Sequence, residues 1–192
     1  MGSGSRTNSE LVEGALVDSR PMLEIGVLGS LVANIDGARV DLGGHKQRAV
    51  LASLILARGR VVSLDALIDD VWGEDPPSAA TSTLQGYVSH LRKALEPDRA
   101  PSDRRILVTE APGYALRLAP ERVDAHQYER MLQDAERLAS TDVTAARRQL
   151  ELAEDMWRGP AFAEFTEMAA AVAETARLNE LRYGAWERRA EL

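Results

Sequence analysis

The stretch STLQGYVSHLRKAL, residues 82–95, predicts a helix over roughly Ala79–Leu95, on which the rest of the fold depends. One side is apolar at helical spacing and predicts a packed face. The other side is small and polar, with Gly86 in the middle, where glycine costs about 1 kcal/mol relative to alanine. Something outside the helix must therefore favour a missing side chain at this position. The apolar residues are Leu84, Val88, Leu91 and Leu95.

The outward side has the chemistry that reads a DNA groove. Glutamine pairs with adenine, serine and threonine pair with bases or phosphate, and histidine, arginine and lysine meet guanine or phosphate. The bare Gly86 permits close approach to the groove. The alternative is an ordinary surface helix packed through its leucines. The candidate contact residues are Ser82, Thr83, Gln85, Gly86, Ser89, His90, Arg92 and Lys93.

The segments around this helix predict a winged helix-turn-helix, in which two packed helices are followed by a β-hairpin. Before it come a strand over 22–32, an Asp36-Gly37 turn with a return strand over 38–42, and a helix over 45–57. A second helix over 64–72 has Ser63 as its N-cap. After it, residues 104–118 form two β runs joined by a Pro112-Gly113 turn.

Residues from 121 onward predict a second, all-helical region, because alanine, glutamate, arginine and leucine dominate there. Asp124 is expected to cap a helix to about Ala139, and Asp142 or Thr141 a second one to about Trp157. Gly159-Pro160 breaks that helix, and a third runs from about Glu164 to the last residue. The fold class is thus an α+β winged helix-turn-helix followed by an all-α, TPR-like helical hairpin domain.

Charge is distributed unevenly along the chain. The net charge is −7 over 192 residues, yet residues 21–118 hold 11 Lys and Arg against 12 Asp and Glu, whereas residues 119–192 hold 10 against 15. A near-neutral first half is compatible with local contact to nucleic acid. Two further sites are candidates for phosphate contact, with a solvated surface as the alternative for each. They are Lys46 and Arg48, in the first turn of a helix, and the Arg104-Arg105 pair.

No catalytic, cofactor or metal motif is present in the sequence, so an enzyme is not expected. The histidines His45, His90 and His126 lie in separate elements, and cysteine is absent. The acidic residues between Asp69 and Asp75 lack the spacing of a calcium loop and are expected to be a solvated face. No apolar run is long enough to span a membrane, so no membrane partner is expected. The lack of cysteine fits a reducing cytoplasm, and DNA binding would make the protein nucleoid-associated.

Residues 28–118 resemble the winged-helix DNA-binding domain of OmpR/PhoB-type regulators. The matching pieces are GRVVSLDALIDDVWGEDPP, TLQGYVSHLRKALEPD and ILVTEAPGYAL. The segments after residue 121, including LAEDMWRGPAFAEF, resemble the bacterial transcriptional activation domain. A winged helix followed by MWRGPAFAEF is similar to the Streptomyces antibiotic regulatory protein (SARP) family.

This resemblance implies a transcription activator of secondary-metabolite (antibiotic) gene clusters. Its partners would be double-stranded promoter DNA with direct repeats, a second copy of itself on the adjacent repeat, and RNA polymerase holoenzyme, recruited through the sigma factor. Contacts would fall on the helix over 82–95 and on the wing from Thr109 to Gly113. Glu110 departs from the basic residue that many relatives carry in the wing.

The expected domains are a disordered leader or cloning remnant over 1–20, the winged helix over 21–119 and the activation domain over 120–192. Because residues 175–192 are still strongly helical, we expect the chain to be an amino-terminal fragment of a longer protein. Three alternatives stay open: a winged-helix repressor, a response-regulator output domain, and a protein-interaction scaffold that does not bind DNA.

Overall fold

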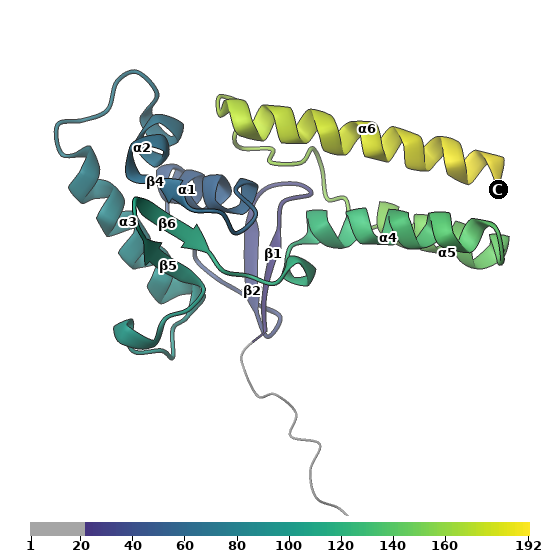
Figure 1. The fold of residues 1–192 in the computed structure, drawn as a ribbon, viewed down its shortest axis with the longest axis horizontal. Helices are drawn as coiled ribbons and strands as arrows, with labels where there is room; N and C mark the ends of the chain where they lie inside the picture. Colours follow the sequence, from purple (N-terminus) through teal and green to yellow (C-terminus); the bar gives the residue numbers. More distant parts are fainter. Residues whose placement is uncertain (1–21) are drawn as a thin grey trace, which may run out of the picture.

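The computed structural model describes residues 22–192, and the leader expected over 1–20 lies outside them. The strands are β1 Leu23–Gly26, β2 Val32–Ile35, β3 Ala38–Arg39, β4 Val62–Ser63, β5 Leu107–Glu110 and β6 Gly113–Leu116. The helices are α1 His45–Leu56, α2 Leu64–Trp72, α3 Ala80–Leu95, α4 Asp124–Ala139, α5 Val143–Glu154 and α6 Ala169–Glu191, with short 3-10 turns η1 Pro101–Asp103 and η2 Pro120–Arg122. Two lobes follow one another along the long axis: the sheets with α1 to α3, then α4 to α6 (Figure 1).

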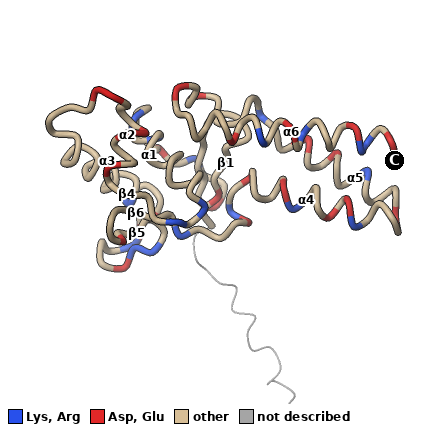
Figure 2. Tube along the Cα trace, turned by 45° about the horizontal axis from the view of Figure 1, so that its top comes forward, with Lys and Arg blue, Asp and Glu red and all other residues tan. Residues whose placement is uncertain are grey.

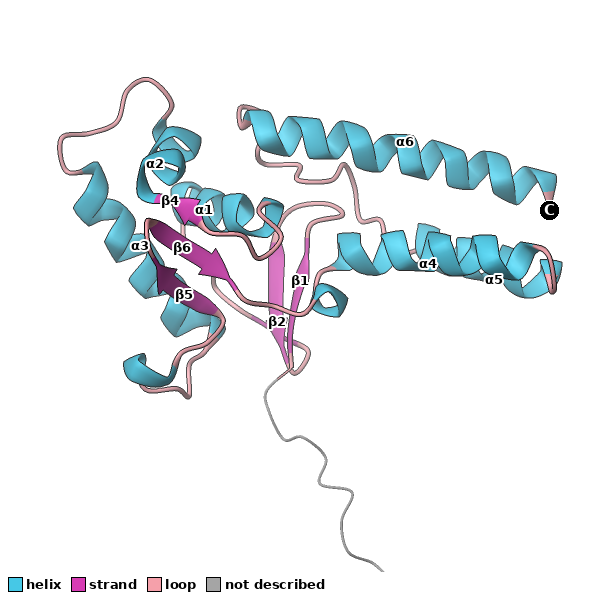
Figure 3. Ribbon diagram, viewed as in Figure 1, coloured by secondary structure: helices cyan, strands magenta, loops and turns pink. Residues whose placement is uncertain are grey.

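Two small antiparallel sheets frame the first lobe (Figure 3). The first has the order β1-β2-β3, with the predicted Asp36-Gly37 turn between β2 and β3. The second has the order β4-β6-β5, in which β5 and β6 form the predicted wing. Gly113 is required here because a Cβ atom would collide with the Val62 carbonyl oxygen of the neighbouring strand.

Helices α1, α2 and α3 form the core of the first lobe, and their predicted limits are confirmed to within about a residue. Ser63 caps α2 as predicted, since its hydroxyl accepts a hydrogen bond from the Ala66 amide at 3.1 Å. The apolar face of α3 packs against α1 and α2. Its fully buried residues there include Leu84 and Leu91.

The prediction of one strand over 22–32 is wrong. The chain leaves the sheet after Gly26 and re-enters it at Val32, so residues 27–31 form a loop, which we call the docking loop. Gly29 turns this loop with a φ of +145°, which favours glycine. The apolar pattern that resembles a strand arises because Val27, Leu28 and Leu31 are fully buried against the rest of the protein.

The docking loop forms backbone hydrogen bonds with the segment between α5 and α6. We call this segment, residues 155–168, the connector. The connector amide of Arg158 donates to the Leu28 carbonyl at 2.8 Å, and that of Phe162 donates to the Val27 carbonyl at 2.9 Å. The peptide groups of the docking loop are therefore satisfied by the second lobe instead of by a sheet partner. The connector contains MWRGPAFAEF, whose apolar members Ala161, Phe162 and Phe165 are buried.

Asp124 lies at the start of α4 but is not its cap. The N-cap position belongs to Val123, and no side chain caps this helix. The Asp124 carboxylate instead accepts hydrogen bonds from the docking-loop amides of Val27 and Leu28, at 2.7 and 3.1 Å. It also pairs with Arg158 at 3.1 Å. Asp142, in contrast, caps α5 as predicted by accepting from the Ala145 amide at 2.9 Å.

Glu164 of the connector makes the other main contact with the first lobe. Its carboxylate accepts from the Leu31 amide at 2.8 Å and from Arg48 Nε and Nη2 at 2.7 and 2.6 Å. The side chains of Arg48 and Glu164 are only 18% and 23% exposed. Burial works against the charge of Glu164, but the hydrogen bonds from Arg48 and Leu31 hold its pKa below the usual range.

Four charged groups make a second junction between the lobes. Arg58, which follows α1, pairs with Glu129 of α4 at 2.6 Å and with Glu174 of α6 at 3.0 Å. Arg177 of α6 pairs with the same two carboxylates. Burial raises the pKa of both carboxyl groups, but the hydrogen bonds from the two arginines outweigh it and hold each pKa below its usual value.

The second lobe consists of the α4–α5 hairpin with α6 lying alongside (Figure 1). Arg182 of α6 lies over the ring of Trp157, 4.4 Å from its centroid, and over that of Trp186, at 5.1 Å. The α5 helix ends at Glu154, before the predicted Trp157, and α6 begins at Ala169, after the predicted Glu164. Both differences arise because the intervening residues form the connector.

We expect Glu164→Ala to lower the free energy of unfolding by about 2 kcal/mol, because it leaves a half-buried guanidinium and the Leu31 amide without their acceptor. Urea unfolding followed by circular dichroism measures this. Glu167→Ala, an exposed glutamate of the same connector, is the matched control. Equal stability of the two variants would contradict the role given to Glu164.

Acid should weaken the junction between the lobes. A carboxyl whose folded pKa is depressed contributes stability in full above its unfolded pKa and loses it as pH falls through the folded pKa. For Glu129, Glu164 and Glu174 the ordinary value is 4.5. The free energy of unfolding should therefore decline as pH falls below that value, and less steeply in Glu164→Gln than in Glu167→Gln. Identical slopes in a pH series of urea titrations would be evidence against this linkage.

Candidate nucleic-acid interface

Helix α3 presents one buried and one open face. The buried row is continuous along the helix, and Leu84, Val88, Leu91 and Leu95 are each at most 2% exposed. On the open face, Thr83 and Arg92 are half-buried, whereas the remaining candidate residues are exposed. The exposed ones are Ser82, Gln85, Gly86, Ser89, His90 and Lys93. The helical period predicted from sequence thus separates the two faces correctly.

No packing contact inside the protein requires a glycine at position 86. A Cβ atom built at this position would meet nothing within 4 Å. Glycine in the middle of a helix costs about 1 kcal/mol relative to alanine, so the protein forgoes stability here without an internal gain. The missing side chain leaves a shallow point at the centre of the open face of α3.

Arg92 and Thr109 connect α3 to the wing. The Arg92 guanidinium donates from Nε to the Leu107 carbonyl at 2.8 Å and from Nη2 to the Thr109 hydroxyl at 2.7 Å. It also lies over the Tyr114 ring at 5.6 Å. These contacts use two of the five N–H donors of Arg92, and they fix the position of β5 beside α3.

The glutamate at the wing, a departure from the basic residue of many relatives, is neutralised by a neighbour. Glu110 forms an ion pair with Arg117, which also donates to the Gly59 carbonyl at 2.8 Å. The wing tip therefore carries no net charge from this pair. Thr109 and Glu110 are both exposed at the end of β5.

The base of the wing is held by a buried carboxylate at the end of α3. Glu96 is 5% exposed and accepts from the amides of Arg105 and Ile106 at 2.9 to 3.1 Å. This clamp leaves the side chain of Arg105 exposed, whereas Arg104 is half-buried. Figure 2 shows lysine and arginine positions beside β5 and β6, with acidic positions among them.

The two candidates in the first turn of α1 have different environments. Lys46 is exposed, and its Nζ lies 5.1 Å from the centroid of the Trp72 ring, which itself stacks on Tyr87 of α3. The prediction that Arg48 faces an anion outside the protein is wrong. The anion that it meets is Glu164 of the connector, and it also donates to the Leu31 carbonyl at 2.5 Å.

One outward residue escaped the sequence reasoning. Thr81 is exposed at the start of α3, one helical turn before Gln85 and two before Ser89. The spacing of four residues was the signal that could have found it. The contacts of Asp124 and Glu164 with the docking loop were also missed, because no local pattern connects residues about a hundred positions apart.

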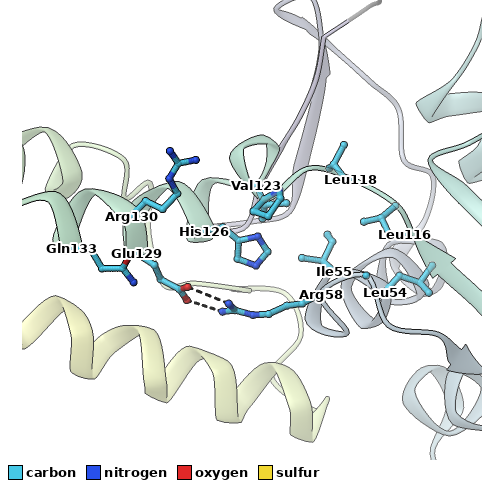
Figure 4. Close-up of a pocket in the computed structure, with 12 residues that line it drawn as sticks. Leu54, Ile55, Arg58, Leu116, Leu118, Val123, His126, Glu129, Arg130 and Gln133 are labelled. Atoms are coloured by element: carbon cyan, nitrogen blue, oxygen red, sulfur yellow. Dashed lines mark hydrogen bonds and ion pairs between the residues drawn. The ribbon is translucent and has the colours of Figure 1, made fainter.

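A cavity lies between the two lobes, away from α3 (Figure 4). This cavity of about 210 Å³ is bordered by Leu54 and Ile55 of α1, Leu116 of β6 and His126 of α4, with the Arg58–Glu129 pair at its edge. Burial, and then the charge of Arg58, lower the pKa of His126. None of the lining residues belongs to α3.

Among residues 22–192, no group of three or more histidine, cysteine, aspartate or glutamate side chains is placed to hold a metal ion. Over the same range, no helix combines the length and apolar character needed to cross a membrane.

Two family descriptions match the two lobes. "Transcriptional regulatory protein, C terminal" matches residues 37–116, and "Bacterial transcriptional activator domain" matches residues 123–192. The regulatory protein AfsR of Streptomyces coelicolor is 40% identical over 143 residues, which are 73% of this chain and 14% of AfsR. The regulatory protein DnrI of Streptomyces peucetius is 34% identical over 176 residues, which are 88% of this chain and 64% of DnrI.

A solved structure has the same arrangement. It is that of Mycobacterium tuberculosis EmbR in complex with a low affinity phosphopeptide, with a TM-score of 0.83 and 34% sequence identity. The match covers 89% of this chain and 45% of the EmbR chain. The chain thus spans less than two thirds of the length of each of these three relatives.

These matches define the class of this chain: a transcription regulator, built from a winged helix followed by a helical activator domain. Within that class the chain belongs to the Streptomyces antibiotic regulatory protein (SARP) family.

Proposed function

We propose that this protein is a sequence-specific DNA-binding transcription activator of secondary-metabolite genes. The observation that carries the proposal is the open face of α3, which is polar, centred on Gly86 and flanked by a wing. Relatives in the same family are named as regulatory proteins, which supports a regulatory role for this chain. The domain limits that go with the proposal are 21–119 for DNA binding and 120–192 for activation.

In this proposal the open face of α3 enters the major groove. Gln85, Ser89 and His90 meet base edges, while Gly86 allows the groove wall to approach the helix backbone. Ser82, Thr83 and Lys93 contact phosphates or bases at the two ends of the helix, and Lys46 and Arg105 contact phosphates at its sides. Arg92 and Thr109 act by positioning the wing, Arg104 lies at its base, and Arg48 is omitted because Glu164 occupies it.

The charge distribution favours binding as a pair. The first lobe is close to neutral, so counterion release from one copy gives limited affinity. Two copies side by side on direct repeats gain effective concentration from one another. The second lobe points away from α3 along the long axis of the molecule (Figure 1), which leaves it free to meet RNA polymerase, with the sigma factor as the proposed contact. Such a protein works in the cytoplasm, on the nucleoid.

Selection of bound sequences from a random duplex pool, followed by electrophoretic mobility shifts, tests DNA binding directly. We expect enrichment of a direct repeat and salt-sensitive binding. Absence of binding to any duplex would favour the protein-interaction scaffold. A promoter–reporter assay separates activation from repression, since a repressor lowers expression from the selected site.

Gly86→Leu should keep the fold and lose at least about tenfold in affinity for the selected duplex, because the new side chain projects into the space that the groove wall needs. Ala176→Leu, which adds the same side chain at an exposed position of α6, is the control for helix and solubility effects. Fluorescence anisotropy with labelled duplex measures both. Unchanged affinity in Gly86→Leu would show that DNA does not bind against the open face of α3.

Substitutions of Gln85 and Lys93 should lower DNA affinity in different ways. Gln85→Ala removes a base contact and should cost about 1–3 kcal/mol on the selected site while leaving random DNA little changed. Lys93→Ala removes a phosphate contact and should weaken all duplexes alike, lowering the slope of log affinity against log salt by about 1. Equal losses of affinity for selected and random DNA in Gln85→Ala would show that this residue does not contact a base.

A further inference from the structure

The second lobe has an open groove between α4 and α6 that the proposed DNA contacts do not use. It encloses about 510 Å³ and is lined by one side of α4, by α6 from Arg177 to Glu191, and by Leu150 of α5. At 1.5 Å per residue, the α6 side of the groove is about 21 Å long. This length corresponds to about four turns of a helix.

The floor of the groove is apolar. Ala135 and Leu150 are 2% and 4% exposed, and Leu132 and Leu181 are partly buried members of the same surface. Apolar side chains of a second element that lie along this floor would lose contact with water, which is favourable at about 25 cal/mol per Å².

The rim of the groove is acidic. Five carboxylates line the groove, against the two guanidinium groups of Arg177 and Arg188. Arg177 is already paired with Glu129 and Glu174, and Glu129 is also held by Arg58, so the carboxylates left for a partner are those of Glu136, Glu180, Glu187 and Glu191. Arg188 reaches Glu136 across the groove at 3.7 Å, but both side chains are about half exposed or more, and such pairs contribute at most about 1 kcal/mol. The carboxylates are Glu129, Glu136, Glu180, Glu187 and Glu191.

Gly184 adds an independent observation. It lies in the middle of α6 and lines the groove, and a Cβ atom at this position would meet nothing within 4 Å. As with Gly86 on α3, glycine here costs about 1 kcal/mol relative to alanine without an internal packing reason. The bare backbone allows another element to approach α6 closely.

From these features we infer that the groove between α4 and α6 binds a basic amphipathic helix of a partner protein. Its apolar stripe lies on Leu132, Leu150 and Leu181, close to Gly184, and its lysine or arginine side chains meet the glutamates of the rim. The two lobes then have complementary tasks, because the near-neutral lobe carries α3 and the acidic lobe carries a groove for a basic segment. The inference does not depend on DNA binding, since the groove contains no residue of the first lobe.

The test uses the full 192-residue chain without DNA. The probe is a fluorescein-labelled synthetic helix of about four turns with leucine along one face and lysine elsewhere, titrated by anisotropy. There are two control peptides, its twins in length: one replaces every lysine with glutamate, and the other scrambles the order of the same residues. We expect the basic amphipathic probe to bind at least about tenfold more tightly than either twin, and more weakly as salt is raised.

Variants locate the binding. Gly184→Leu fills the groove without a clash and should lose about tenfold in affinity for the probe. The double change Glu180→Lys and Glu187→Lys should lose a similar amount by reversing the rim charge. Glu151→Lys, the same charge change at an exposed position of α5 outside the groove, should leave binding unchanged.

Equal binding of the three probes would overturn the inference, as would full binding by Gly184→Leu. Sedimentation velocity provides the remaining check. Self-association that Gly184→Leu abolishes would assign the groove to a second copy of this chain and would equally overturn it. Failure of these tests leaves the DNA proposal unaffected, because mobility shifts with selected duplex measure a different lobe.

Discussion

The structure depends on the docking of the loop over residues 27–31 onto the second lobe. This loop interrupts what would otherwise be a long strand, and its buried amides and carbonyls need partners. Asp124 and Glu164 supply carboxylate acceptors, and the connector backbone supplies donors to the loop carbonyls. Hydrogen bonds to charged groups are among the stronger ones in proteins, so the two lobes pack as one continuous core.

That junction has a functional consequence for the winged helix. Arg48 and Arg58 bracket α1, and each is held by carboxylates of the second lobe. Helix α1 in turn packs against α3, whose position relative to the wing is set by Arg92 and Glu96. A continuous series of packed elements therefore connects the helical lobe to the proposed reading face.

Two mid-helix glycines mark the two open surfaces of the molecule. Gly86 and Gly184 each face open space, whereas Gly26 and Gly113 are required by close internal neighbours. A glycine that has an internal explanation says nothing about partners. A glycine that lowers helix stability with no internal gain indicates a surface where something else approaches, and the two surfaces lie in different lobes.

The sequence by itself determined the helices, the wing, the two-part organisation and the separation of faces on α3. These follow from local rules, namely apolar spacing, caps such as Ser63 and Asp142, and turn residues such as Asp36-Gly37. Only the tertiary structure decided what the charged side chains do. Asp124 and Arg48 look locally like a helix cap and an anion-facing residue, yet each is used by a partner far away in the chain. Because Coulomb and hydrogen-bond energies depend on distance in space and not in sequence, no local pattern could assign them.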